Sequence, residues 1–419
     1  EVVEAGDGRP AGRVEQFGDH TGPFRTRPYA TATMPHTPRL VRLADDPATL
    51  PAALQAVWDA GDAAVVAPAN TPLPAAAEAA LQGGPALPEG TALVVPTSGS
   101  TGVPRAVVLS HAALRASTAA SVVALGCEPG ERWLLALPLR HVAGLQVLAR
   151  ARTLGTSPVV VDDPGDPHRI AAAAADAEHA ALVPTQLVRC LDAGDDVVTT
   201  LAGLRSILVG GGPADPARLD EARARGLRIV MSYGLTETCG GCVYDGRPLS
   251  GVDVAVDAPA GEVGRIRLCG PMLATGELTT TGDGTPVIDR SRFVDGWFVT
   301  DDVGALEDGT LTVVGRADAT IISGGANVDA AAVEAALHTD PSVADAVVVG
   351  VTDDEWGQRV RAVVVPADPS DPPTLERLRD AVRAALPASH APRELQLVAR
   401  IPRDGMGKVT AAVRAELSS

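Results

Sequence analysis

The sequence predicts an α/β fold in two unequal parts. A large N-terminal domain of parallel sheets with helical crossovers carries a small β subdomain, and a small, mobile α+β domain follows it. From Leu93 onward, short β-branched runs alternate with amphipathic segments, which is typical of parallel sheets. Between about Gly251 and Gly315 the spacing of apolar residues that is typical of helices disappears, and it returns after this region. The length of 419 residues also exceeds one ordinary compact domain.

The strands and helices of the large domain are expected to alternate. Strands are expected at 92–96, 133–138, 158–162, 181–184, 206–210 and 228–233, and helices at 110–126, 142–154, 166–177, 184–192 and 216–225. Because a helix separates each strand from the next, neighbouring strands should be parallel. Short alternating runs with Gly turns, between about 251 and 315, predict a small antiparallel or barrel-like subdomain.

The last hundred residues predict a compact α+β unit. Its elements are expected as helix 329–337, strands 344–351 and 360–365, helix 374–386 and strand 395–401. At the other end, the first residues are polar, Gly-rich and without periodicity, and the chain does not begin with Met. We therefore expect a disordered leader over 1–34, a core domain over 35–317 and a C-terminal lid over 318–419.

Charge and cysteine content restrict the partners. A formal net charge of -17 argues against nucleic acid and anionic membrane surfaces, because both require clustered cations. No apolar run approaches the roughly 18 residues of a membrane span. The five cysteines are odd in number and sparse, which fits a reducing compartment. We expect a cytoplasmic protein, and a homodimer stays open as its assembly.

A turn rich in glycine and hydroxyl groups follows the strand expected at 92–96. Its glycines and hydroxyls let backbone N–H groups and side-chain donors surround a phosphate without steric obstruction. A Ser/Thr-rich surface loop is the alternative. The residues assigned to the phosphate are Thr97, Ser98, Gly99, Ser100, Thr101 and Gly102.

The segment SYGLTET (232–238) lies at the carboxyl end of another expected strand, the edge where α/β sheets bind ligands. Glu237 offers a hard oxygen ligand for Mg²⁺, and Thr236 offers a hydroxyl for a phosphate oxygen. A helix cap is the alternative for this Thr-Glu pair. The segment is therefore a candidate metal and phosphate site.

Two further patterns suggest contacts to a nucleotide or its partner. Asp302 ends an expected strand, and Arg316 follows fourteen residues later. A carboxylate and a guanidinium suit two ribose hydroxyls, one accepting and one donating, and a surface ion pair is the alternative. Ser323, Gly324 and Gly325 form a turn that allows close backbone approach to a ligand. An ordinary turn between strand and helix is the alternative there.

Lys408 is the only lysine in the chain. Arginine replaces lysine throughout, as expected from a high-GC genome, so the one retained lysine requires a chemical reason. It lies on the Gly-containing loop DGMGK, and its compact ammonium suits the charge that develops when a carboxylate attacks a phosphate. A solvated tail lysine is the alternative.

The ordered motifs TSGSTGVPR, YGLTET, TDD, GRADATIISGGANVD and PRDGMGK resemble the adenylate-forming superfamily of acyl- and aryl-CoA ligases, adenylation domains and luciferases. The resemblance covers about Leu93 to the C-terminus. It implies that a carboxylic acid and ATP form an acyl-adenylate, with Mg²⁺, and that a thiol such as coenzyme A then displaces AMP. It also implies a C-terminal lid that rotates between the two steps.

The resemblance assigns a role to each matching residue. Asp302 and Arg316 would hold the ribose, Glu237 would bind Mg²⁺, and Lys408 would serve only the first step. The hinge would be Asp318, and the turn at Ser323, Gly324 and Gly325 would face the thiol after rotation. The acid and adenine would lie against Gly210, Gly211, Ser232 and Tyr233, and a simple strand-to-helix turn is the alternative for the two glycines.

The segment HVAGLQVLAR (141–150) bears on the acid. By resemblance, His141 lies against the acyl pocket, where it can gate the thiol or hold the carboxylate; a capping or core histidine is the alternative. Arg150 follows nine residues later on a mostly apolar helix, and a buried guanidinium requires a carboxylate. The segment is similar to o-succinylbenzoate-CoA ligases of menaquinone biosynthesis, in which a cation there meets a second carboxylate. A surface or helix-end arginine is the alternative.

Three other functions stay open at this point. One is another aryl- or acyl-CoA ligase of secondary metabolism, and the second is a stand-alone adenylation enzyme that loads a carrier protein. The third is an inactive nucleotide-binding relative. The intact set of Glu237, Asp302, Arg316 and Lys408 argues against the third.

Overall fold

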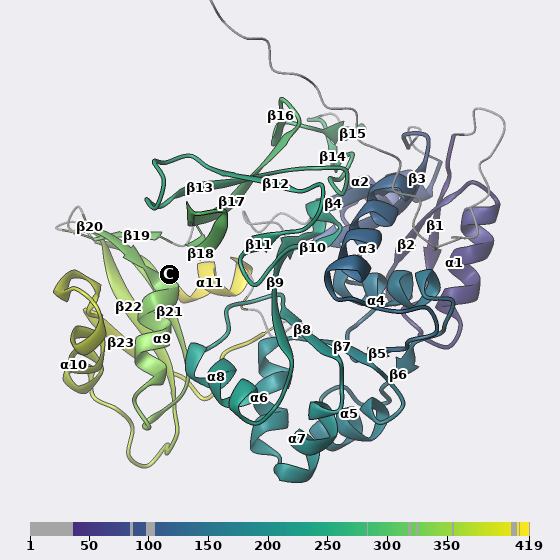
Figure 1. Ribbon diagram of the computed structural model, residues 1–419. Helices are drawn as coiled ribbons and strands as arrows, with labels where there is room; N and C mark the ends of the chain where they lie inside the picture. The colour runs from purple at the N-terminus through teal and green to yellow at the C-terminus, as the bar shows by residue number, and fades with distance from the viewer. Residues whose placement is uncertain are drawn as a thin grey trace, which may run out of the picture.

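The computed structural model describes residues 37–83, 87–97, 105–282, 284–316, 320–323, 326–353, 356–403, 409 and 411–418. Within these ranges the strands form four sheets, three in the first three quarters of the chain and one after it (Figure 1). The α/β class and the smaller C-terminal α+β unit are confirmed. The leader expected at 1–34 lies outside the described residues.

The first sheet has six strands in the order β1-β2-β3-β4-β14-β15, of which β1 to β4 are purple to blue in Figure 1 and β14 and β15 are green. Its elements are β1 (Leu40–Leu43), α1 (Leu50–Asp59), β2 (Ala63–Val66), α2 (Ala75–Leu81), β3 (Thr91–Thr97), β4 (Arg105–Ser110), β14 (Gly276–Thr280) and β15 (Pro286–Asp289). Strands β1 to β3 are parallel, whereas β4, β14 and β15 add in antiparallel fashion. This sheet is therefore mixed, where the sequence predicted parallel neighbours.

Strand β4 explains this difference. It pairs with β3 directly after the phosphate turn, with Thr97 opposite Arg105, so the apolar run after the turn is a strand and not yet a helix. The helix α3 (His111–Ala124) begins one residue later than expected. Ser110 is its N-cap, and the side-chain oxygen accepts the backbone N–H of Ala113 at 3.1 Å.

The second sheet has seven strands in the order β11-β10-β9-β8-β7-β5-β6. Its elements are β5 (Trp133–Leu135), α4 (Val142–Thr153), β6 (Val159–Val160), α5 (Pro167–Ala174), β7 (His179–Leu182), α6 (Pro184–Asp192), α7 (Asp195–Ala202), β8 (Ser206–Gly210), α8 (Pro216–Ala224), β9 (Ile229–Leu235), η1 (Thr236–Thr238), β10 (Gly240–Tyr244) and β11 (Arg247–Pro248). Strands β5 to β9 are parallel, as predicted, and β10 and β11 are antiparallel.

Helices cover both faces of this sheet because successive strand residues point to opposite sides. Leu135 packs in a core cluster with residues of α3 and α4, and its neighbour Leu134 packs in another cluster with residues of α5, α6 and α7. Gly144 lets α4 approach the loop after β5, because a Cβ at this position would overlap with the carbonyl oxygen of Pro138. The start of α4 is thereby held close to the carboxyl end of β5.

The third and fourth sheets account for the rest of the described chain. The third is antiparallel: β12 (Asp253–Val256), β13 (Gly264–Cys269), β17 (Trp297–Glu307) and β16 (Phe293–Val294), with β18 (Thr310–Arg316) on β17, which confirms the small β subdomain. The fourth contains β19 (Thr320–Ser323), β20 (Ala326–Asp329), β21 (Val343–Asp353), β22 (Gly357–Pro366) and β23 (Glu394–Leu397), with α9 (Ala330–His338), α10 (Leu375–Ala385), η3 (Ala388–His390) and α11 (Ala411–Leu417).

Across the described ranges, no helix combines the length and the apolar character that a bilayer crossing requires.

Candidate active site

Several predicted site residues meet at the carboxyl edge of the seven-stranded sheet. Gly210 is the last residue of β8, and it is in register with Ser232 on the neighbouring strand β9. Thr236 and Glu237 follow β9 directly in the short helix η1. His141 follows β5 and is the N-cap residue of α4, although its side chain makes no capping hydrogen bond. The strand order therefore gathers residues that are far apart in sequence.

Glycines make the outer strands of this edge pack closely. A Cβ at Gly234 would overlap with the carbonyl oxygen of Gly240, and a Cβ at Gly241 would overlap with the hydroxyl of Ser232. Gly211, just past the end of β8, has a φ of 87°, which L-residues with side chains rarely adopt. The edge therefore offers backbone groups and small side chains to a ligand.

A chain of polar contacts leads from this edge into the β subdomain. The hydroxyl of Tyr233 donates to Asp302 Oδ2 at 2.8 Å, and burial together with this carboxylate raises the pKa of Tyr233. Asp302 is opposite Arg316 in the β17–β18 register, and the guanidinium lies 3.7 Å from Asp302 Oδ1. The predicted pair is thus adjacent, with a buried carboxylate beside a half-exposed guanidinium. Such a pair can accept from one hydroxyl of a ribose and donate to the other.

Glu237 is a buried carboxylate in a site rich in charge. Burial raises its pKa, and the carboxylate of Glu277 raises it further; its own backbone N–H, Arg292 and Arg105 oppose the rise. The two arginines already pair with Glu277, at 3.4 Å for Arg292 and 3.0 Å for Arg105. Both oxygens of Glu277 therefore face arginines, whereas Glu237 takes part in no ion pair among the described residues, and its carboxylate is a hard oxygen donor of the kind that Mg²⁺ prefers. The residues present therefore fit a divalent cation at Glu237.

Arg150 lies away from these residues, toward the amino edge of the sheet. It is only 5% exposed, its Nε donates to Ser121 Oγ at 2.9 Å, and its guanidinium carbon is 4.6 Å from the centroid of the Trp133 ring. Trp133 is the first residue of β5. Among the residues described by the structure, no carboxylate lies within ion-pair distance of Arg150. The surface half of the alternative is therefore wrong, because the side chain is buried, whereas the helix-end half stands, because Arg150 lies in the last turn of α4.

Sequence reasoning missed the polar residues that lie between His141 and Arg150. Gln146 is 1% exposed; its Nε2 donates to the carbonyl oxygen of Cys239 at 2.7 Å, and its Oε1 accepts from Thr118 at 3.1 Å. The spacing of four residues between Gln146 and Arg150 was a usable signal, because such residues share a helix face. Tyr244, whose hydroxyl is 2.7 Å from Ser121 Oγ, had no comparable local signal.

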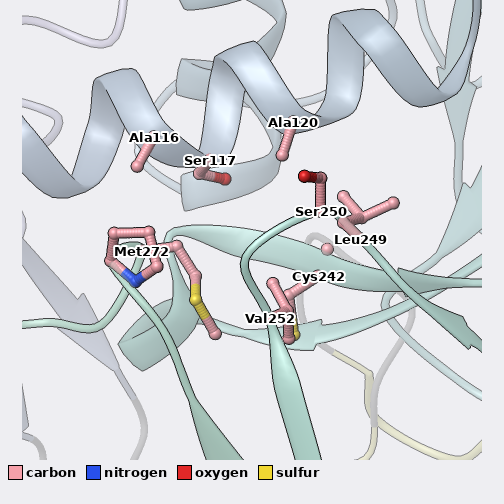
Figure 2. Close-up of a pocket in the computed structure, with 10 residues that line it drawn as sticks. Ala116, Ser117, Ala120, Cys242, Leu249, Ser250, Val252 and Met272 are labelled. Carbon is pink, nitrogen blue, oxygen red and sulfur yellow. The ribbon is translucent and has the colours of Figure 1, made fainter. Parts of the chain in front are cut away.

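A small pocket lies next to the polar contacts of Gln146 (Figure 2). Ala116, Ser117 and Ala120 of α3 line one wall, and Cys242 and Leu249 belong to the opposite wall. Ser117 donates to the carbonyl oxygen of Cys239 at 3.2 Å, and Gln146 donates to the same oxygen, so the pocket adjoins the polar contacts of Gln146. Burial raises the pKa of Cys242 to about 12, which leaves its thiol protonated and unreactive at neutral pH.

The remaining predicted residues are only partly described. Thr97 ends β3 and Ser323 ends β19, and the buried Oγ of Ser323 has no hydrogen-bond partner within the described ranges. The other predicted residues lie outside the described ranges: Ser98, Gly99, Ser100, Thr101, Gly102, Asp318, Gly324, Gly325 and Lys408. Their assignments stay predictions.

Two family models match this chain. The model described as "AMP-binding enzyme" matches residues 34–277, and the one described as "AMP-binding enzyme C-terminal domain" matches residues 332–408. A Mycobacterium tuberculosis protein named "Probable 2-succinylbenzoate--CoA ligase" is 44% identical over 373 residues, which cover 86% of this chain and 92% of that protein. The similarity thus extends over both parts of the fold.

Solved structures resemble the whole described architecture. The o-succinylbenzoate CoA synthetase (MenE) of Bacillus subtilis, in complex with the acyl-adenylate intermediate OSB-AMP, has a TM-score of 0.77 at 26% identity, covering 91% of this chain and 88% of that one. The same enzyme with ATP and magnesium ion has a TM-score of 0.76 at 25% identity, covering 91% and 89%. The amide bond synthetase McbA from Marinactinospora thermotolerans also has a TM-score of 0.77, at 26% identity, covering 92% and 91%.

Proposed function

Since this chain belongs to the AMP-binding enzyme family, we propose that it is an ATP-dependent acid–CoA ligase acting on o-succinylbenzoate. The acid carboxylate attacks the α-phosphorus of ATP and pyrophosphate leaves, and the thiol of coenzyme A then attacks the acyl carbon and AMP leaves. The 44% identical relative with this name supports the assignment. The observation that carries the choice of acid is the buried Arg150, which has no carboxylate partner in the described chain.

The first step would use the carboxyl edge of the seven-stranded sheet. Asp302 and Arg316, which are adjacent, would hold the ribose hydroxyls. Glu237 would hold Mg²⁺, with Thr236 toward a phosphate oxygen, and bound Mg²⁺ would neutralise charge on the phosphates. Lys408 would stabilise the charge that develops as the carboxylate attacks. The turn Thr97, Ser98, Gly99, Ser100, Thr101 and Gly102 would surround the phosphates.

The acid would lie along α4. His141 stands at the start of this helix, and Gly210, Gly211, Ser232 and Tyr233 would form the wall beside it. Arg150 is nine residues further, which is about 13 Å along a helix that rises 1.5 Å per residue. o-Succinylbenzoate is an aromatic acid with a second carboxylate at the far end from the activated one. Arg150 would provide the partner for that second carboxylate, and the acid would provide the missing anion.

The experiment measures AMP release from ATP with coenzyme A and one of two acids. We expect AMP with o-succinylbenzoate and little with benzoate, which lacks the second carboxylate. Arg150→Met, which keeps a long apolar side chain, should raise the KM for o-succinylbenzoate by about 10- to 100-fold, the loss of a charge-assisted hydrogen-bonded pair. The KM for ATP should stay unchanged. AMP release with benzoate and none with o-succinylbenzoate would mean a different aryl-CoA ligase.

The thiol acceptor needs its own measurement. The amide bond synthetase has as high a TM-score as the CoA synthetase, so likeness of fold does not decide the second step. We propose coenzyme A because the similarity at 44% identity is to a CoA ligase. Product that forms with a phosphopantetheinyl carrier protein and not with free coenzyme A would identify the carrier-loading alternative.

The organisation of the chain is also part of the proposal. We propose a leader at 1–34, a core domain at 35–317, a hinge at Asp318 and a C-terminal lid at 318–419, with the turn at Ser323, Gly324 and Gly325 facing the thiol. The change of sheet between β18 and β19 supports this division. ATP and coenzyme A as substrates support a cytoplasmic location. The homodimer is tested by the molecular mass in solution.

A further inference from the structure

A buried row of polar and aromatic side chains crosses the amino edge of the seven-stranded sheet. Trp133, His179 and Ser206 are the first residues of β5, β7 and β8, and the parallel register pairs Trp133 with His179 and His179 with Ser206. Glu131 lies two residues before β5. None of these four residues is more than 8% exposed. The catalytic steps proposed above use none of them.

Hydrogen bonds fix the imidazole of His179 at both nitrogens. Its Nε2 lies 2.8 Å from Glu131 Oε2, and its Nδ1 lies 2.8 Å from Ser206 Oγ. A neutral ring satisfies both contacts, because Nε2–H donates to the carboxylate and Nδ1 accepts the serine hydroxyl. Glu131 is held in turn by the backbone N–H of Glu128 at 2.7 Å and by Arg205. The ring therefore has one orientation.

This fixed ring connects to Arg150 through Trp133. The rings of His179 and Trp133 are stacked, with centroids 5.1 Å apart and an angle of 25° between the planes. The guanidinium of Arg150 lies over the Trp133 ring, with its carbon 4.6 Å from the centroid. The Nε1 of Trp133 is buried and has no hydrogen-bond partner among the described residues, so no such bond there holds the indole in place. The His179 ring is the polar anchor of this stack.

The same residues also approach Cys127, and together they are close enough to suggest a metal site. Two ligands of one tetrahedral Zn²⁺, each about 2.0 to 2.2 Å from the ion, lie about 3.4 Å apart. The 2.8 Å between His179 Nε2 and Glu131 Oε2 is the distance of a direct hydrogen bond and leaves no room for such an ion. Burial also raises the pKa of Cys127 to about 12 in the metal-free protein. The cluster is therefore a hydrogen-bond network.

We propose that His179, held by Glu131 and Ser206, is a positioning residue that sets the orientation of Trp133 and thereby of Arg150 for the second carboxylate of the acid. This inference rests on the function proposed above. A buried pair of a carboxylate and a histidine, such as Glu131 and His179, stabilises a fold little more than apolar residues of similar volume would. The gain is orientation, because a guanidinium that must meet a carboxylate at hydrogen-bonding distance has to be fixed before the acid arrives.

The test is a double-mutant cycle on the full-length protein. His179→Phe keeps an aromatic ring but removes both hydrogen bonds, and it should raise the KM for o-succinylbenzoate by about fivefold to tenfold, with kcat and the KM for ATP unchanged. Combined with Arg150→Met, it should raise this KM no further, because His179 acts only through Arg150. Glu131→Gln, which can still accept the His179 N–H, should have a smaller effect in the same direction.

His111→Phe is the matched control. His111 also contacts a tryptophan, Trp58, with ring centroids 5.3 Å apart. This variant should leave the KM for the acid unchanged. If His179→Phe raises the KM equally with and without Arg150→Met, its role is a general structural one and the proposal is overturned. If the single variant Arg150→Met leaves the KM for o-succinylbenzoate unchanged, the proposed acid is wrong. If Arg150→Met raises this KM but His179→Phe does not, the acid stands and the positioning role of His179 is wrong.

Discussion

The two edges of the seven-stranded sheet are built in opposite ways. At the carboxyl edge, Gly210 and Gly211 are at least partly exposed, and Glu237 is a buried carboxylate whose pKa is raised. At the amino edge, His179 is completely buried and both of its nitrogens have hydrogen-bond partners. An edge that admits and releases a charged nucleotide needs polar groups whose hydrogen bonds and charges are satisfied only when the ligand is bound. Glu131, His179 and Ser206, which only hold a side chain in place, can satisfy one another within the protein.

The helix α4 connects the two edges. It begins after His141 at the carboxyl edge and carries Arg150 toward the amino edge. In the function proposed here, the reaction is carried out at the first edge and the acid is recognised near the second. Variants at the carboxyl edge should therefore change turnover for every acid, and variants near Arg150 should change the KM for acids with a second carboxylate.

The largest effect should come from Lys408→Ala. Lys408 lies outside the described residues, and its proposed role belongs to the reaction and not to acid recognition. Removal of one group that stabilises developing charge lowers the rate by about 100- to 1000-fold. Adenylation, measured as pyrophosphate release, should fall by this factor for every acid, whereas thioester formation from supplied acyl-adenylate should be spared. An equal loss in both half-reactions would contradict the role.

Glu237→Gln should come next. It removes the proposed Mg²⁺ ligand but keeps the shape of the side chain, and the rate of adenylation at low Mg²⁺ should fall by about 100-fold. Asp253→Asn is a suitable control, because Asp253 is exposed on β12. A change in the KM for o-succinylbenzoate without a change in the Mg²⁺ dependence would mean that Glu237 takes part in acid recognition and does not bind Mg²⁺.

The raised pKa of Glu237 gives this prediction a pH dependence. Mg²⁺ binds the carboxylate form, so the Mg²⁺ affinity of the native protein should fall on acidification at a higher pH than for an ordinary Glu, whose pKa is about 4.3. Since the folded pKa lies above the unfolded one, the ionised side chain destabilises the ligand-free fold above both values, and this cost disappears below them. Glu237→Gln should therefore raise the Tm of the ligand-free protein at neutral pH.

Gln146→Glu should affect only the recognition of the acid. It puts a carboxylate four residues before Arg150 on the same helix face and supplies the partner that Arg150 lacks among the described residues. The KM for o-succinylbenzoate should rise by about 10-fold because the acid must displace an internal ion pair. Gln146→Leu is the control, since it removes the amide without a charge. A similar rise with both variants would point to lost packing.

Local sequence was sufficient where short-range rules decide the structure. The strand β8 was predicted at its observed bounds, and Ser110 and Thr374 cap the predicted helices, because caps and turns depend on a few neighbouring residues. The strand β4 was missed because its apolar run directly precedes a helix. The elements before β3 were missed as well. The resemblance over the motifs then supplied the site at the carboxyl edge.

The amino edge could not be predicted from the sequence. Trp133, His179 and Ser206 are more than twenty residues apart and meet because β7 lies between β5 and β8. Strand order is a long-range property, and no local pattern of these three residues indicates it. The structure therefore adds most where it brings the first residues of several strands together.

The smallest effect compares two tyrosines on neighbouring strands, Tyr233 of β9 and Tyr244 of β10, whose hydroxyls contact the proposed ribose carboxylate and the serine beside Arg150, respectively. Tyr233 donates to Asp302 at 2.8 Å, and Tyr244 lies 2.7 Å from Ser121, which accepts from Arg150. Tyr233→Phe removes one hydrogen bond to the proposed ribose carboxylate and should raise the KM for ATP by about twofold to fivefold with every acid. Tyr244→Phe should instead raise the KM for o-succinylbenzoate by a similar factor and leave that for ATP unchanged. If both variants change the same KM, the two edges do not divide reaction from recognition.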